Sequence, residues 1–159
     1  MRHHLTARLE LPLPLDRVFR FFGAAENLQR ITPPELGFRI LTPLPIEMRP
    51  GALIDYRIRL FGLPLRWRTE ITEWDPPHRF VDIQLRGPYR EWTHTHTFEP
   101  TPDGRGTIIH DHVQYQLPLT PLGDLAWPIV RLQLRRIFAY RERATRQQLL
   151  TAGQEHRAG

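Results

Sequence analysis

The chain has 159 residues and no cysteine, and its formal net charge of +5 includes 22 basic residues that are all arginine. The length suits one domain that buries its own core, and the lack of cysteine excludes disulfides, thiolate-ligated metal centres and thiol nucleophiles. The arginines are dispersed and form no basic run interleaved with aromatics, which argues against a nucleic-acid partner. No secretory signal and no stretch of about 20 apolar residues occurs, so we expect a cytoplasmic protein.

The N-terminal segment predicts one strand and two short helices. Apolar and polar side chains alternate over residues 3–11, which is typical of a half-buried strand. Asp16 is predicted to cap a first short helix over residues 17–22, and a second short helix is predicted over residues 24–31.

The middle of the chain predicts six further strands joined by turns. They are expected over residues 38–41, 52–61, 65–74, 79–86, 89–99 and 107–117. Turn formers such as Gly62 and the Pro76-Pro77 pair separate them. Consecutive strands with such short connections form an antiparallel meander.

The C-terminal segment changes to a helical period and predicts a helix over residues 125–150. Its expected apolar stripe consists of Leu125, Ile129, Leu132, Ile137, Tyr140 and Ala144. Pro128 lies inside this pattern and either kinks the helix or marks its start. The arginines of residues 131–146 are expected on the solvated side, with contact to a membrane surface as a secondary expectation. Residues 1–152 are thus predicted to form one domain, and residues 153–159 a polar tail.

One long helix is the only element left to cover one face of a sheet of about seven strands. We therefore expect an α+β fold in which a strongly curved antiparallel sheet wraps around the C-terminal helix, with two short helices after the first strand. Because one helix cannot fill the hollow of such a sheet to its ends, an internal cavity is expected between them.

Four histidines lie on two neighbouring predicted strands: His94 and His96 on one, His110 and His112 on the other. Residues two apart on a strand share a face, so four imidazoles would meet at a metal ion if both pairs faced each other. That register mixes polar and apolar side chains on both faces. A register shifted by one residue gives one apolar and one polar face, and it is favoured because burial selects the pairing. It predicts His94 and His96 inside, and His110 and His112 in solvent.

The favoured register brings five side chains of interest to the inner face: Trp92, His94, His96, Asp111 and Tyr115. A buried carboxylate is costly unless it is paired, so Asp111 is expected to pair with a histidine, with the Tyr115 hydroxyl nearby. We consider three roles for this cluster: a polar network that fixes the register, an anchor for a ligand's carbonyl or hydroxyl, and a general base. No metal is expected, although His94, His96 and Asp111 could form a three-ligand site.

The cavity wall is expected to come from apolar and aromatic residues of several elements: Phe22, Tyr56, Trp67, Phe98, Val113, Ile129 and Ile137. The chain contains no phosphate-binding loop, dinucleotide fingerprint or nucleophile elbow, and we expect no cofactor.

Several segments resemble the START-related SRPBCC superfamily, whose members share the helix-grip fold. The resemblance spans nearly the whole chain and rests on residues 15–22, 27–34, 73–80, 87–98, 111–118, 121–123 and 136–141. These segments resemble in particular the bacterial single-domain subgroup labelled polyketide cyclase/dehydrase-like.

The resemblance implies a deep hydrophobic cavity between the sheet and the C-terminal helix. It implies a carrier or sensor for an apolar small molecule such as a lipid, a polyketide, an isoprenoid or an aromatic compound. The alternative is a cyclase/dehydratase-type enzyme that uses the inward His-Asp-Tyr cluster. We expect a monomer or a weak homodimer.

Overall fold

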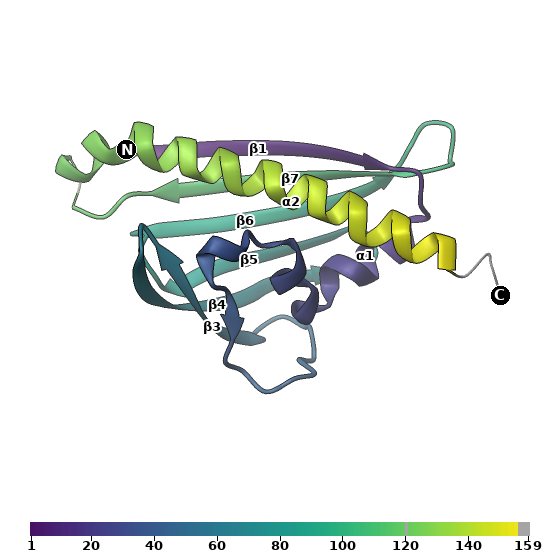
Figure 1. Cartoon of the computed structure of the whole chain (residues 1–159), viewed down its shortest axis with the longest axis horizontal. Helices are drawn as coiled ribbons and strands as arrows, with labels where there is room; N and C mark the ends of the chain where they lie inside the picture. Colours follow the sequence, from purple (N-terminus) through teal and green to yellow (C-terminus); the bar gives the residue numbers. More distant parts are fainter. Residues whose placement is uncertain (120, 156–159) are drawn as a thin grey trace.

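A computed structural model describes residues 1–119 and 121–155. Within these residues, seven strands form one antiparallel sheet in the order β1-β7-β6-β5-β4-β3-β2. The strands are β1 (Arg2–Leu11), β2 (Arg39–Ile40), β3 (Leu53–Leu60), β4 (Leu63–Asp75), β5 (Arg79–Arg86), β6 (Glu91–Pro100) and β7 (Thr107–Gln116). Strands β2 to β7 form the predicted meander, and β1 pairs with β7, so the first and the last strand lie side by side (Figure 1).

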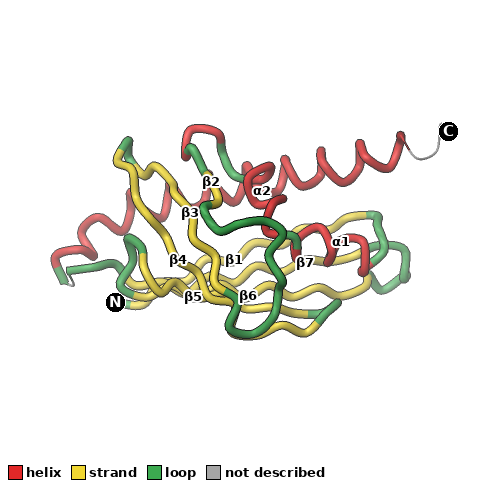
Figure 2. Tube along the Cα trace, turned by 90° about the horizontal axis from the view of Figure 1, so that it is seen from below, coloured by secondary structure: helices red, strands yellow, loops and turns green. Residues whose placement is uncertain are grey.

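Helices cover one face of this sheet. They are α1 (Leu15–Gly23), the 3₁₀ helices η1 (Ala25–Ile31), η2 (Pro34–Leu36) and η3 (Leu122–Ala126), and the long helix α2 (Trp127–Glu155). Helix α2 crosses the sheet diagonally (Figure 1), and the β3–β4 end of the sheet bends up toward the helical layer (Figure 2). This arrangement is the α+β helix-grip fold that the sequence predicts.

The core between α1 and the sheet consists of side chains that the alternation of the strands places inward. Leu11, Val18, Phe98 and Ile109 are each no more than 2% exposed. Leu149, near the end of α2, belongs to the same cluster and ties the helix to it. Burial of one such side chain contributes about 1.5–3 kcal/mol, so this cluster anchors both helices to the sheet.

The start of α1 differs from the prediction. The helix begins at Leu15, and the carbonyl oxygen of Pro14 accepts the backbone N–H groups of Arg17 and Val18. Asp16 therefore lies within the first turn and makes no capping hydrogen bond, because Pro14 already occupies the cap position. Its carboxylate still lies at the helix end where negative charge is favourable.

The inward face of α2 is rotated relative to the predicted stripe. Leu125, Ile129 and Leu132 are 80%, 62% and 70% exposed, respectively. The side chains that face the sheet in this part of the helix include Val130 and Leu134. Apolar residues occupy both sides of the first turns, so periodicity alone does not select the buried side.

The ends of α2 also refine the prediction. Pro128 is the second residue of the helix, so it marks the helix start. Backbone N–H groups in the first turn have no acceptor within the helix, so the N–H that proline lacks costs no hydrogen bond there. The helix continues to Glu155, beyond the predicted end at residue 150, and residues 156–159 of the predicted tail lie outside the described residues. In the part of the chain that the structure describes, no helix is both long and apolar enough to cross a lipid bilayer.

Candidate functional site

The pairing of β6 with β7 places the histidines as the alternation predicts. His96 lies opposite Asp111, and His94, His96 and Asp111 are 5%, 2% and 8% exposed. His110 and His112 lie on the opposite face of the sheet. The side chain of His110 is 43% exposed there. The predicted register is therefore confirmed, and a site formed by all four imidazoles is excluded.

A pocket of about 180 Å³ lies between the sheet, the short helices η1 and η2, and α2. Most of its wall is aliphatic or aromatic. Seven of the predicted residues line it: Phe22, Tyr56, Trp67, Trp92, His94, His96 and Ile137. Its acidic and basic side chains are Asp82, His94, His96 and Arg141, so the charge of the pocket wall is confined to β5, β6 and one position of α2.

Five predicted residues lie outside the pocket wall. Phe98 is buried in the core beneath α1, and Val113 and Tyr115 are buried beneath the N-terminal half of α2. Ile129 is 62% exposed, because the phase of α2 turns it toward solvent. Asp111 lies behind the two histidines and contacts both of them.

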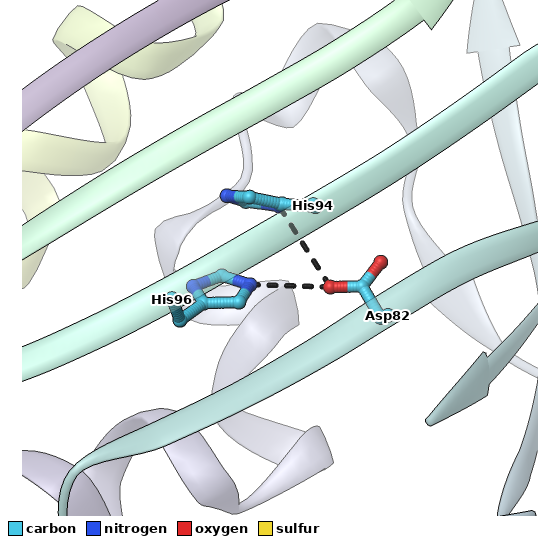
Figure 3. Close-up of side chains that lie close together, drawn as sticks. All are labelled: Asp82, His94 and His96. Carbon is cyan, nitrogen blue, oxygen red and sulfur yellow. Dashed lines mark hydrogen bonds and ion pairs between the residues drawn. The ribbon is translucent and has the colours of Figure 1, made fainter. Parts of the chain in front are cut away.

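Two carboxylates hold the inward imidazoles from opposite sides. Oδ1 of Asp111 accepts a hydrogen bond from His94 Nε2 at 2.9 Å and lies 2.8 Å from His96 Nδ1, in a contact outside hydrogen-bond geometry. Oδ2 of Asp82 lies 3.1 Å from His96 Nε2, within hydrogen-bond geometry, and 3.8 Å from His94 Nδ1 (Figure 3). The centroids of the two rings are 3.7 Å apart. We call these four residues the His–Asp cluster.

Burial and neighbouring charge give the two histidines opposite pKa shifts. Burial, followed by the proximity of His96, lowers the pKa of His94 to about 4, so this imidazole is neutral near pH 7. Burial also opposes protonation of His96, but its contacts with Asp111 and Asp82 outweigh that cost and raise its pKa. Burial disfavours the ionised form of Asp111 as well, yet the two histidines hold its pKa well below its usual range. The cluster therefore combines a neutral imidazole with one that favours its charged form.

Arg141 is a pocket residue that the sequence places on the solvated side of the helix. It lines the pocket, and its guanidinium carbon lies 5.4 Å from the ring centroid of Phe22 and 6.0 Å from that of Phe138. Within the described residues its buried Nε has no hydrogen-bond partner. Its position seven residues after the buried Leu134 is the signal that could have identified it, since residues seven apart share a helix face.

Asp82 is the second residue that sequence reasoning missed. It pairs with His94 across β5 and β6, and its neighbour Phe80 pairs with His96 on the same face. Asp82, His94 and His96 each offer one ligand atom within 4.8 Å of the others, and they are the single group of this kind among the described residues. These three are the side chains that could hold a metal ion.

The fold is shared with several solved structures. The Zhui aromatase/cyclase from Streptomyces sp. R1128 aligns with a TM-score of 0.75 and 15% identity, covering 94% of this chain and 94% of that one. TTHA0849 from Thermus thermophilus aligns with a TM-score of 0.71 and 21% identity, covering 94% and 99%. Ara h 8.0201 aligns with a TM-score of 0.65 and 16% identity, covering 95% and 99%. At these identities the likeness concerns the fold alone.

The comparison of sequences adds the family. No curated protein matches the chain. Residues 2–147, from the first strand to the last turns of α2, match the family described as polyketide cyclase / dehydrase and lipid transport. Since this match includes the whole sheet, the pocket wall and the His–Asp cluster, the chain belongs to the polyketide cyclase/dehydrase and lipid transport family.

Proposed function

We propose that the chain binds an apolar small molecule in the pocket between the sheet and α2, as a carrier or sensor. The observation that carries this proposal is the composition of the wall, which is aliphatic and aromatic except for a few polar groups, the charged ones on β5, β6 and α2. Binding sites for small molecules typically combine a large apolar surface with a few polar groups that orient the ligand. The family description, which includes lipid transport, supports the same class of ligand.

The volume sets the size of the group that the pocket takes up. A dry apolar cavity of about 150 Å³ is large enough to bind benzene. The pocket, at about 180 Å³, therefore accommodates one ring or a short acyl segment of a ligand without rearrangement. Lipids, polyketides, isoprenoids and aromatic compounds all supply such a group.

The polar groups would orient the ligand through an oxygen atom. The Arg141 guanidinium is a donor at the pocket wall, and Asp82 is an acceptor. A carbonyl oxygen would accept from Arg141, and a hydroxyl would also donate to Asp82. A ligand with one oxygen function beside an apolar body satisfies both parts of the wall.

Native mass spectrometry of freshly purified protein, followed by extraction, is the test that identifies a bound compound. A thermal-shift screen of lipids and aromatic compounds then measures binding in the presence of EDTA. A ligand at 100 times its dissociation constant adds about 2.7 kcal/mol, which raises the melting temperature by about 5–10 °C at this chain length. A screen in which every compound shifts the melting temperature by less than about 1 °C contradicts the proposal.

Two substitutions on α2 link binding to the pocket. Ile137→Trp places an indole in the pocket, so it should abolish the ligand-induced shift. Ala139→Trp adds the same side chain at an exposed position of the same helix and should leave the shift intact. Equal effects of the two variants would mean that the ligand binds elsewhere.

A cyclase/dehydratase-type enzyme is the second candidate, and one observation favours it. The neutral imidazole of His94 lines the pocket and donates through Nε2 to Asp111, which is the arrangement of a general base held by a carboxylate. Such a base would remove a proton next to a ligand carbonyl, as cyclisation of a poly-β-ketone requires. Incubation with a short poly-β-ketone should then give a cyclised product with the wild type and none with His94→Gln, while ligand binding persists in both. If the wild-type protein gives no product above the spontaneous background, the enzyme hypothesis is wrong and only the carrier or sensor role remains.

A further inference from the structure

The contacts with Asp111 indicate which nitrogens of the His–Asp cluster carry protons. Asp111 Oδ1 lies 2.9 Å from His94 Nε2 and 2.8 Å from His96 Nδ1. A carboxylate only accepts hydrogen bonds, so His94 Nε2, which forms the hydrogen bond with Asp111, carries the proton of that imidazole. In a neutral imidazole the other nitrogen then carries a lone pair. His94 Nδ1 therefore presents a lone pair on the side away from Asp111, where His96 Nε2 also lies.

On that side both nitrogens lie near the carboxylate of Asp82. Asp82 Oδ2 lies 3.1 Å from His96 Nε2 and 3.8 Å from His94 Nδ1 (Figure 3). His96 Nε2 donates to this oxygen when it carries a proton, and it offers a lone pair there when a metal ion takes the place of that proton. A proton on His96 satisfies Asp82, but it leaves the Nδ1 lone pair of His94 facing the same oxygen.

We propose that Asp82, His94 and His96 form a binding site for one divalent transition-metal ion, with Asp111 as the residue that orients both imidazoles from behind. Metal bonds of about 2.0–2.2 Å to nitrogen and oxygen place neighbouring ligand atoms about 3.0–3.6 Å apart. The 3.1 Å separation already fits, and the 3.8 Å separation needs a closure of a few tenths of an ångström. A carboxylate behind a ligating histidine is the usual outer partner of such sites, because it fixes the tautomer and the ring orientation.

The ligand set selects the class of ion. Two imidazoles and one carboxylate suit Zn²⁺, Fe²⁺ and Co²⁺, whereas Mg²⁺ and Ca²⁺ prefer oxygen ligands throughout. All three residues line the pocket, so the remaining coordination positions face the space assigned to the apolar ligand. The ion would there bind a ligand oxygen that the apolar wall brings to it.

The proposed site has a different third ligand from the one that the sequence analysis considered. The expectation of no metal considered His94 and His96 with Asp111 as the third ligand. The structure places Asp111 on the far side of both rings and supplies Asp82 on the near side. The metal site does not depend on the proposed carrier role, because apolar binding is measured in EDTA.

Titration of the untagged, chelator-stripped protein with Co²⁺ and with Zn²⁺ tests the proposal. We expect one ion per chain by calorimetry, and visible absorption bands of protein-bound Co²⁺ that Zn²⁺ abolishes. Asp82→Ala should weaken binding at least about tenfold, and Asp111→Asn should weaken it by about 10–100-fold through the orientation of the rings. Circular dichroism confirms that each variant is folded, and Asp82→Asn, which keeps the side-chain shape, replaces Asp82→Ala if that variant is not.

The matched control is the other close pair of histidines. His4 Nδ1 and His112 Nε2 lie 3.2 Å apart on the solvent face of the sheet and could bind an ion adventitiously. His112→Ala should leave the affinity and the Co²⁺ spectrum unchanged. The proposal is overturned if the stripped protein binds no ion, or if binding survives substitution of Asp82 and is lost in His112→Ala.

Discussion

Removal of the charge of Asp111 tests the energetic role of the His–Asp cluster. The side chain of Asp111 is 10% exposed and contacts both histidines, through the 2.9 Å hydrogen bond and the 2.8 Å contact described above. Asp111→Asn keeps an acceptor for His94 but loses the charge beside His96. A hydrogen bond to a charged group is worth about 1.5–3 kcal/mol, and we expect Asp111→Asn to cost an amount in this range. Asp111→Ala also leaves the His94 N–H unpaired and should cost about 3–5 kcal/mol.

Urea unfolding in EDTA measures both losses as shifts of the midpoint at unchanged slope. In a thermal melt, the Asn variant should lose about 3–12 °C, taking about 2–4 °C for each kcal/mol at this size. Glu99→Gln is the control, because Glu99 forms a carboxylate–histidine pair with His110 at 3.0 Å on the same two strands but in solvent. It should change the stability by less than about 0.5 kcal/mol. If Asp111→Ala lowers the free energy of unfolding no more than this control does, Asp111 does not make the stabilising contacts with His94 and His96 that we describe.

Three further outcomes follow from the packing and the charges. Leu134→Ala should cost about 2–5 kcal/mol and Leu132→Ala less than about 0.5 kcal/mol, because Leu134 is 4% and Leu132 is 70% exposed; equal losses in urea unfolding would mean that the phase of α2 is wrong. Gly106→Ala should cost about 1–3 kcal/mol, since its Cβ would lie 2.6 Å from the carbonyl oxygen of Leu11, and a melting temperature equal to that of the wild type would contradict this contact. The histidines hold the pKa of folded Asp111 below its unfolded value, so its contribution is present above about pH 4 and is lost as the pH falls further. Urea midpoints of the wild type and Asp111→Asn should therefore converge below about pH 4, and a constant difference between them down to pH ~3 would argue against a lowered pKa.

The order of elements and the register of β6 with β7 could be predicted because burial leaves a strict period of two in these strands. In β6, Trp92, His94 and His96 alternate with threonines, and only one pairing with β7 separates apolar from polar side chains. The helix α2 offers no such contrast. Leu132 and Leu134 are both apolar, so the choice between two faces depends on tertiary contacts that local periodicity does not contain.

The candidate site could be predicted only for the strands that the histidines occupy. Asp82 was missed because Val81 and Ile83 alternate with it and make the other face of β5 look like the buried one. Phe80 and Val81 are in fact each 4% exposed, so β5 does not divide into one buried and one solvated face at this point. A buried carboxylate in such a strand becomes recognisable only when its partner on β6 is known.

The pairing of β1 with β7 has a consequence for how the chain folds. Arg2 pairs with Gln116 and Leu11 with Thr107, so the ladder between these strands joins segments about 100 residues apart. Contacts of such long range carry a large loop-closure entropy and form slowly. During synthesis on a ribosome, β1 emerges first and has no partner strand until β7 has followed it. The unpaired backbone edge and the apolar face of β1 are therefore exposed for most of translation. This makes β1 the segment where a chaperone is expected to act and where misassembly between nascent chains would begin.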